Sequence, residues 1–228
     1  MERWRSRRAV RIAGYALLAL VLLLVLAQLF LPSIAAQRIT DKLSPYGSVQ
    51  SVSVSAWPAI ELLWGSAESV TVNARSLALT PAQSASLLAK ASGSDRVDAT
   101  VAALKEGPLR LTDAVLAKRG HALSGAATTS AADVAAALPP GVGVSLLASE
   151  GGRVAVRVRG SLFGLTAGLD VLAEASGGSL VAHPVAAPVH SLHLTVFSDP
   201  RIDVTAIGAR ALGTQPPSYR LSMSALLR

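Results

Sequence analysis

The pattern of hydrophobic and polar residues divides the chain into three parts. Residues 12–31 form the run IAGYALLALVLLLVLAQLFL, which has no charged residue and a single amide, Gln28. A helix of that length extends about 30 Å, the thickness of a bilayer's hydrocarbon core. Apolar residues then recur at helical spacing within residues 32–47, and polar and aliphatic residues alternate from residue 48 onward. The pattern predicts a transmembrane helix (12–31), a juxtamembrane helix (32–47) and a β-rich domain (48–228).

The alternation within residues 48–228 is typical of half-buried strands. One-sided alternation favours antiparallel over parallel sheets, and we expect the aliphatic side chains to face the interior. The alternating segments are 51–55, 69–73, 96–101, 153–159, 192–196, 202–206 and 219–225. The valines that we expect to be buried are Val52, Val54, Val70, Val72, Val154, Val156 and Val158.

Two short helices are predicted between the strands. Thr80 can cap the first, with Pro81 in its first turn and Gly93 beyond its end. Ser130 and Asp133 resemble a capping box that begins the second, and the prolines at 139–140 must end it. The predicted fold class is α+β, in which an N-terminal transmembrane helix precedes an antiparallel sheet domain packed on two or three helices.

The charges at the N-terminus predict an orientation in the membrane. Residues 1–11 contain five arginines and one acidic residue. Arginine-rich segments stay in the cytoplasm, so we expect residues 1–11 to form a basic cytoplasmic tail and the bulk of the chain to be extracytoplasmic. A cleaved signal peptide is the alternative, with small residues available at 33–36. The length of the apolar run favours an uncleaved signal-anchor in the cytoplasmic membrane.

Composition excludes several classes of function. The chain has no cysteine, which rules out disulfides, thiolate metal sites and cysteine nucleophiles. Most of the net charge of +7 lies in the N-terminal tail, so nucleic acid is not an expected partner. Aromatic residues make up only 4% of the chain, so valine, leucine and alanine must build the interior. That interior is either a thin packed layer or the lining of an apolar cavity.

One segment carries a resemblance to a known family. Residues 57–65 (WPAIELLWG) followed by 68–74 (ESVTVNA) resemble a recurring block of the LmeA-like phospholipid-binding proteins of actinobacterial cell envelopes. The order of basic tail, single span, amphipathic helix and strand 49–56 is similar too. The resemblance implies half of a tubular lipid-binding fold, in which a strongly curved antiparallel sheet wraps a helix and encloses an apolar groove for acyl chains. It also implies phospholipid binding in support of envelope lipid or lipoglycan assembly, without catalytic residues.

The first candidate site is this aromatic block. Ile60, Leu63 and Trp64 share one face of a short helical turn, and Trp57 precedes the turn. These four residues could contact an acyl chain or dip into a membrane. The alternative is a hydrophobic plug that closes one end of the sheet, because clustered aromatic residues usually pack in the core.

The second candidate site is a stripe of arginines. Arg153, Arg157 and Arg159 lie on one face of a predicted strand, and guanidinium groups bind phosphate through two oxygens. The stripe could therefore contact a lipid headgroup. The alternative is a solvated strand face whose charges protect a sheet edge.

Motifs for catalysis and metal binding are missing from the sequence. His190 and His193 point to opposite faces of a strand, so no metal site is expected. There is no Gly-x-Ser-x-Gly elbow, no phosphate-binding glycine loop and no close pair of acids. Together with what the resemblance implies, the missing motifs lead us to expect a membrane-anchored, non-enzymatic phospholipid-binding protein without a cofactor. The alternative is a structural module that binds another envelope protein through a sheet edge or the Trp57–Trp64 tip.

Overall fold

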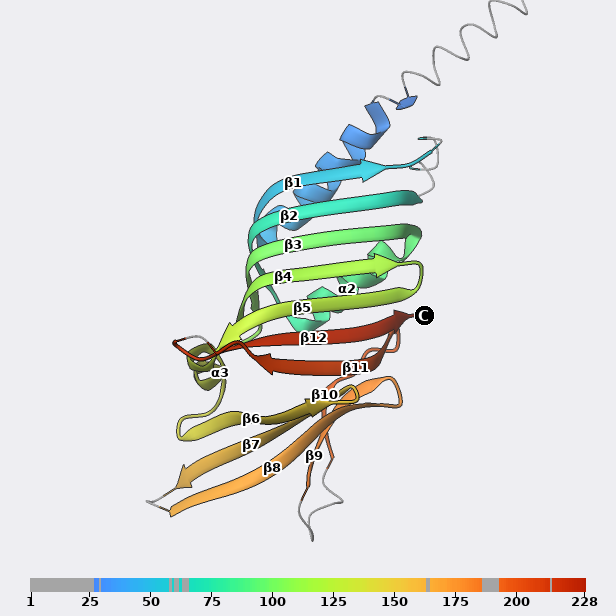
Figure 1. Ribbon diagram of the computed structural model, residues 1–228. Coiled ribbons are helices and arrows are strands. Elements are labelled where there is room, and N and C mark those ends of the chain that lie inside the picture. Colours follow the sequence, from blue (N-terminus) through green and yellow to red (C-terminus); the bar gives the residue numbers. More distant parts are fainter. Residues whose placement is uncertain are drawn as a thin grey trace, which may run out of the picture.

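The computed structural model describes residues 27–28, 30–57, 59, 62, 66–162, 165–185, 193–213 and 215–228. Within these residues the fold is α+β, as predicted, with two mostly antiparallel sheets and three helices (Figure 1). The helices span residues 30–43, α2 (Pro81–Lys90) and α3 (Ala131–Ala137). Short 3₁₀ turns occupy η1 (Ser44–Tyr46) and η3 (Ala91–Gly93). The predicted span over residues 12–31 lies mostly outside the described residues, among which no helix is long and apolar enough to cross a membrane.

The larger sheet has seven strands in the order β1-β2-β3-β4-β5-β12-β11. Every neighbouring pair is antiparallel except β2 and β3, which are parallel. The prediction of antiparallel pairing is wrong at this pair, because α2 carries the chain back so that β3 starts at the same end as β2. The strands are β1 (Gly47–Ser55), β2 (Ala67–Leu79), β3 (Ser94–Glu106), β4 (Leu109–Arg119), β5 (Ala122–Ser130), β11 (Ile202–Ala211) and β12 (Ser218–Leu227).

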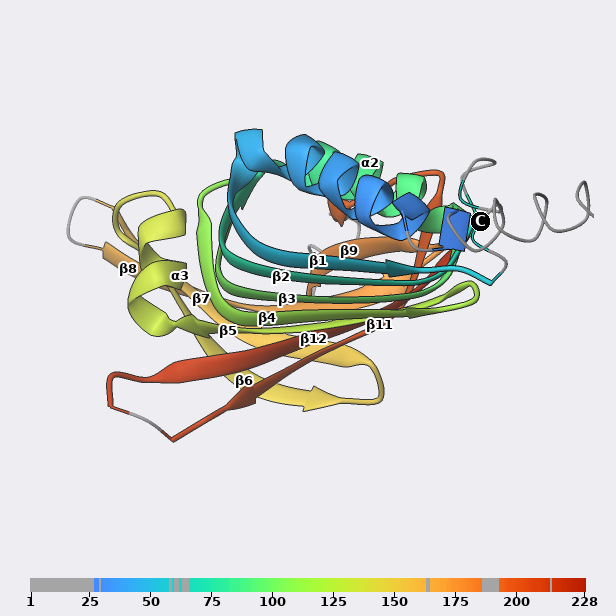
Figure 2. The same ribbon diagram turned by 90° about the horizontal axis from the view of Figure 1, so that it is seen from above.

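The larger sheet is strongly curved, and two helices lie on its concave side (Figure 2). The helix over residues 30–43 packs through Ala35, Ala36, Ile39 and Leu43 on a cluster built from β1, β2 and β3. Helix α2 packs through its buried Ala85 on a second cluster, which includes Leu123, Ile202, Ala225 and Leu227. The concavity therefore holds helices and packed aliphatic side chains.

The sequence signals for α2 and α3 form the expected caps. The Thr80 hydroxyl accepts a hydrogen bond from the Gln83 backbone N–H at 3.3 Å, and the Gln83 side chain accepts one from the Thr80 N–H at 2.8 Å. Ser130 accepts in the same way from the Asp133 N–H at 3.0 Å. These bonds satisfy N–H groups that a helix start leaves without partners, so both helices begin where the sequence predicts.

The smaller sheet has five antiparallel strands in the order β10-β9-β8-β7-β6 and is inserted between β5 and β11. Two of its hairpins turn on glycine pairs, Gly151-Gly152 and Gly177-Gly178, all with φ between 59° and 81°. A two-residue hairpin turn of type I′ has positive φ at both positions, which glycine adopts without strain. The strands are β6 (Val142–Glu150), β7 (Arg153–Leu162), β8 (Leu165–Ser176), β9 (Ser179–Pro184) and β10 (Leu194–Phe197).

These two glycine turns join the sheets. The Gly178 carbonyl accepts a hydrogen bond from the Val204 N–H at 2.8 Å, and the Gly152 carbonyl accepts one from the Ile207 N–H at 3.0 Å. The Ser149 hydroxyl also accepts from the Ala209 N–H at 2.9 Å. The smaller sheet thus satisfies donors along β11, the edge strand of the larger sheet, and blocks that edge from pairing with another chain.

The predicted strand faces are confirmed for segments 51–55, 69–73 and 153–159, but burial is less complete than expected. In segment 192–196 the prediction is wrong, because Leu194 and Val196 are 68% and 57% exposed on the outermost strand of the smaller sheet. Val54, Val70, Val72 and Val154 are buried, whereas Val52, Val156 and Val158 are half-buried. A slip of one residue would exchange the two faces of a strand, so burial of the valines fixes which side chains point outward. In the smaller sheet, Val156 and Val158 face the same side as buried Val154 but are only half-buried.

Candidate functional site

The smaller sheet presents six aliphatic side chains on one face. In the strand register, one row crosses β6, β7 and β8 at Val144, Val158 and Leu169, and the next row crosses them at Leu146, Val156 and Val171. Five of the six are half-buried, and Leu169 is 40% exposed. The helix over residues 30–43 and α2 lie over the larger sheet, so they do not cover these residues (Figures 1 and 2). We call these six residues the apolar face.

The apolar face looks toward the same side as the helices. Phe197 of β10 pairs with Leu180 of β9, two residues before Ala182. Ala182 pairs with Ala173 of β8, and Ala173 pairs with Val154 of β7, so these side chains lie on the same face of the sheet as the apolar face. Phe197 also packs against the cluster that contains Ala85 of α2. The covered interior of the larger sheet therefore continues into the uncovered apolar face of the smaller one.

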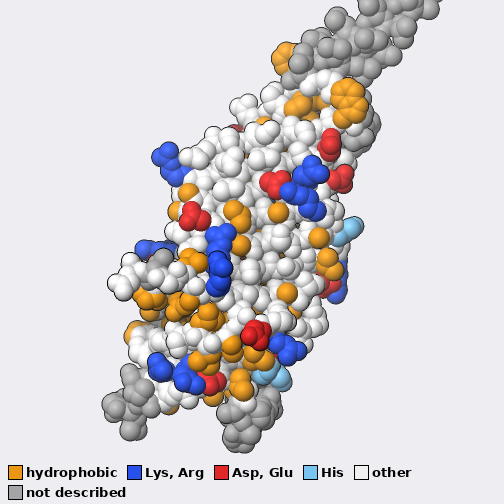
Figure 3. Space-filling view, viewed as in Figure 1, with side chains coloured by type: hydrophobic (Ala, Val, Ile, Leu, Met, Phe, Trp, Pro, Cys, Tyr) orange, Lys and Arg blue, Asp and Glu red, His pale blue; other side chains and the backbone are white. Residues whose placement is uncertain are grey.

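The opposite face of the smaller sheet is charged. Arg157 binds Asp170 through two hydrogen bonds, Nε to Oδ1 at 2.7 Å and Nη2 to Oδ2 at 2.9 Å. The hydrogen bond from Arg157 holds the pKa of Asp170 below its ordinary value. Arg153 pairs with Glu174 at 2.9 Å, and Arg159 is exposed. Figure 3 shows charged side chains over β7, β8 and β9 on the outer side of the molecule.

The arginine stripe therefore shares one face, as predicted, but two of its members are paired with acids on the neighbouring strand. Cross-strand pairs of this kind are what the solvated-face interpretation expects. A role in headgroup binding stays a prediction for Arg153, Arg157 and Arg159. For Arg153 and Arg157, a phosphate would have to compete with a carboxylate that is already bound.

The aromatic block is described only in part. Trp57 is 77% exposed just beyond the end of β1, so this side chain does not plug the core. Ala59 is buried, and Leu62 packs on the cluster beneath the helix over residues 30–43. The predicted contacts Ile60, Leu63 and Trp64 lie outside the described residues. Ala59 and Leu62 were not predicted, because neither falls on the helical face that Ile60, Leu63 and Trp64 share by their spacing.

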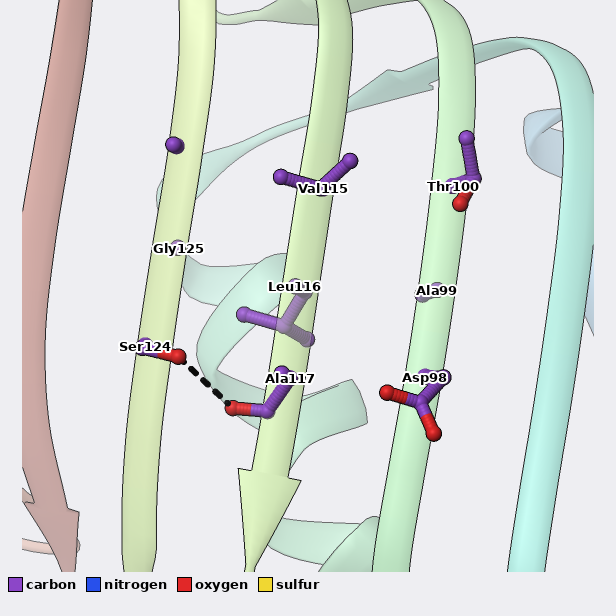
Figure 4. A pocket seen from close by; sticks show the side chains of 9 residues that line it. Asp98, Ala99, Thr100, Val115, Leu116, Ala117, Ser124 and Gly125 are labelled. Atoms are coloured by element: carbon purple, nitrogen blue, oxygen red, sulfur yellow. Dashed lines mark hydrogen bonds between the residues drawn. The ribbon is translucent and has the colours of Figure 1, made fainter.

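Two depressions on the described surface are shallow and open. One, of about 260 Å³, lies on the outer face of the larger sheet, where Asp98, Val115 and Ser124 are among the residues that line it (Figure 4). Asp98 is already bound to Arg119 at 2.7 Å, and the Ser124 hydroxyl donates to the Ala117 carbonyl at 3.5 Å. The other, of about 320 Å³, lies beside α3 and is lined by Lys105, Gly107, Pro108, Arg110, Asp133 and Ala136. The first is smaller than the roughly 300–1,000 Å³ typical of ligand pockets and the second is at the low end of that range, and both carry charged side chains.

A buried lysine is the feature that the sequence analysis missed most clearly. Lys118 lies within β4, is 3% exposed, and its Nζ donates to the Ser94 carbonyl. Burial lowers the pKa of Lys118, and the nearby Asp95 opposes that shift. The alternation of Ala114 and Leu116 along β4 continues to Lys118 and could have predicted its inward direction.

Histidines and acids come together once on the charged face. The rings of His183 and His193 pack edge to face with their centroids 5.6 Å apart, and His183 Nδ1 lies 4.0 Å from Glu174 Oε1. In the part of the chain that the structure describes, no three His, Asp or Glu residues are arranged to hold a metal ion. The cluster therefore offers no metal centre of the usual kind.

The geometry singles out an open, uncharged sheet face as the candidate site. Its six aliphatic side chains offer no hydrogen-bonding or nucleophilic group, so contact with an apolar partner is the chemistry that this face supports. Comparison with protein-family models, curated proteins and solved structures finds no match to this chain.

Proposed function

We propose that this chain is a membrane-anchored, non-enzymatic phospholipid-binding protein of the bacterial cell envelope, and that acyl chains lie on the apolar face. One observation carries the proposal. Six aliphatic side chains of β6, β7 and β8 form two adjacent rows, and neither the helix over residues 30–43 nor α2 covers them. The predicted span over residues 12–31 places this face in a domain attached to a membrane.

The chemistry of the face favours an acyl chain as its occupant. Each methylene group that leaves water for an apolar surface contributes about 0.8 kcal/mol, so several methylenes across the two rows are enough for binding. An acyl chain has no polar atoms that would lose hydrogen bonds to water, whereas a peptide laid over the same rows would bury its backbone groups. The headgroup stays in water at the rim.

The position of the face supports the same proposal. The apolar face continues through Phe197 into the cluster under α2. A further cluster lies under the helix over residues 30–43, which follows the predicted span. Covered apolar clusters therefore line one side of the domain from the N-terminal helix to the smaller sheet, and on that side the apolar face is the part that the helices leave uncovered.

Photo-crosslinking tests the proposal on the full chain. The protein is reconstituted in vesicles that contain a phospholipid with a diazirine in its acyl chain, irradiated, digested and mapped by mass spectrometry. We expect labelled peptides from β6, β7 and β8 in addition to the N-terminal span. Labelling confined to residues 1–34 would contradict the proposal.

Two leucines of similar exposure provide a matched comparison. Leu169 on the apolar face is 40% exposed, and Leu226, which faces outward on the larger sheet, is 45% exposed. We expect Leu169→Gln to reduce labelling of the smaller sheet several-fold and Leu226→Gln to leave it unchanged. If the chain is instead a structural module that binds another envelope protein, neither substitution should change lipid labelling.

A further inference from the structure

The exposed side of the N-terminal helix changes character along its length. Phe30 and Ile34 are 59% and 49% exposed, and they are followed on the exposed side by Arg38, Asp41 and Lys42. Residues four apart lie above one another on a helix, so Phe30, Ile34 and Arg38 form one stripe. The stripe passes from large apolar side chains to charged ones within one turn, about 6 Å.

The other side of this helix is fixed to the domain. Ala35, Ala36, Ile39 and Leu43 pack on the cluster that includes Val54 and Val72. The helix therefore cannot rotate to bury Phe30 and Ile34 without losing these contacts. Whatever covers the exposed apolar turn must come from outside the described part of the domain.

A third exposed apolar residue lies at the same end of the molecule. The helix ends at Leu43 and β1 begins at Gly47, so β1 runs back along the helix, and its last residues approach the helix start (Figure 1). Trp57, two residues beyond β1, is 77% exposed. Figure 3 shows hydrophobic side chains at this end, beside the N-terminal segment.

We propose that Phe30, Ile34 and Trp57 form a bilayer-contact surface that sets the depth and tilt of the domain. Phe30 and Ile34 lie below the phosphate level, Trp57 lies in the interface, and Arg38 and Lys42 lie in the aqueous headgroup layer. Tryptophan prefers that interface, and arginine and lysine prefer its aqueous side. The inference rests on the proposed membrane anchoring and adds a defined boundary between Ile34 and Arg38.

A phospholipid bilayer is the occupant that the chain itself indicates. The uncharged run of 12–31 includes Phe30 and ends three residues before Ile34 in the sequence. A helix that leaves the bilayer and packs rigidly on β1, β2 and β3 transmits its tilt to the whole sheet. The smaller sheet lies at the opposite end of the molecule, so its apolar face is held away from the membrane (Figure 1).

Spin labelling tests the boundary directly, because the chain has no native cysteine. The variants Ile34→Cys, Arg38→Cys, Lys42→Cys and Trp57→Cys are labelled with a nitroxide and reconstituted as full chains in vesicles of phosphatidylcholine and phosphatidylglycerol. Accessibility to oxygen, which concentrates in lipid, is compared with accessibility to a water-soluble nickel complex. The exposed outer-face position Leu226→Cys is the aqueous control.

We expect the labels at 34 and 57 to favour oxygen several-fold over the control, and the labels at 38 and 42 to match it. Aqueous labels at both 34 and 57, in a protein that resists alkaline carbonate extraction, overturn this inference and leave membrane anchoring intact. Release of the protein by carbonate overturns both.

A second measurement keeps the native Trp57 in place. The chain has three tryptophans, so the double substitution Trp4→Phe and Trp64→Phe leaves Trp57 as the only one. Its fluorescence should be quenched by lipids brominated near the headgroup more strongly than by lipids brominated at the chain end. Equal and weak quenching by both lipids places Trp57 in water and contradicts the inference.

Discussion

Arg157 and Asp170 face each other across β7 and β8, and both nitrogens of the guanidinium fork that point at the carboxylate are hydrogen-bonded to it, at 2.7 and 2.9 Å. Paired geometry of this kind raises the pKa of Arg157 and lowers that of Asp170. The central arginine of the stripe is thus oriented by its own sheet. Because Arg157 already binds Asp170, we expect the charged face of the smaller sheet to contribute less to lipid binding than the apolar face does.

Removing Arg157 should therefore have little effect on lipid engagement. We expect Arg157→Gln to leave acyl-chain labelling of β6, β7 and β8 within about twofold of wild type, and to lower the melting temperature only slightly, because exposed ion pairs stabilise little. Photo-crosslinking and thermal melting in detergent micelles measure the two effects. A loss of labelling as large as that of Leu169→Gln would restore Arg157 as a headgroup contact.

The turn that leads into β11 should make the protein sensitive to acid. The Arg201 side chain, and then its backbone N–H, hydrogen-bond the Asp199 carboxylate and lower its pKa from 3.8 to about 2. A carboxylate with a lowered pKa in the folded state stabilises the fold above its unfolded pKa, and this contribution is lost as the pH falls from about 3.8 to about 2. Melting curves between pH 5 and pH 2.5 should show a smaller acid-induced fall for Asp199→Asn than for wild type. Arg201→Gln should reduce the fall similarly, and an unchanged fall in both variants contradicts the assignment.

The buried Lys118 should make the protein more stable as the pH rises into the alkaline range. Because burial lowers its pKa below 10.5, the folded state releases this proton at a pH where the unfolded state still holds it. Stability attributable to Lys118 should therefore rise between the lowered pKa and 10.5. We expect Lys118→Met to be about as stable as wild type at pH 7, since it removes a desolvated charge, and to be the less stable of the two at pH 10. Urea unfolding at both values measures this, and a pH-independent difference would falsify the prediction.

Two adjacent leucines at the end of β12 test the register of the larger sheet. Leu227 is 5% exposed within the cluster under α2, whereas Leu226 is 45% exposed on the outer face. Leu227→Ala should lower the free energy of unfolding by about 2–5 kcal/mol, as expected for a truncated core leucine. Leu226→Ala should change it by less than about 0.5 kcal/mol. Urea unfolding of the pair decides the register, and similar losses in both variants would show that the strand is not anchored as described.

Local features of the fold were predictable because their causes lie within a few residues. Thr80 and Ser130 begin helices through hydrogen bonds to groups three residues away. The alternation around Val54, Val70 and Val154 determines which side of each strand is buried, because successive side chains point to opposite faces. The arginine stripe shares one face of β7 for the same reason, so its sequence spacing was sufficient to predict the arrangement.

The sequence by itself determined the helices, the strand faces and the α+β class, and only the tertiary structure decided which strands became neighbours. The parallel pairing of β2 with β3, the pairing of β5 with β12 across an inserted sheet, and the carbonyls of Gly152 and Gly178 on the edge of β11 are non-local contacts. Packing between distant segments also decides that Lys118 is buried and that Val156 and Val158 are only half-buried. Periodicity states that a side chain faces one side of a strand, but whether a helix then covers that side depends on where distant parts of the chain pack.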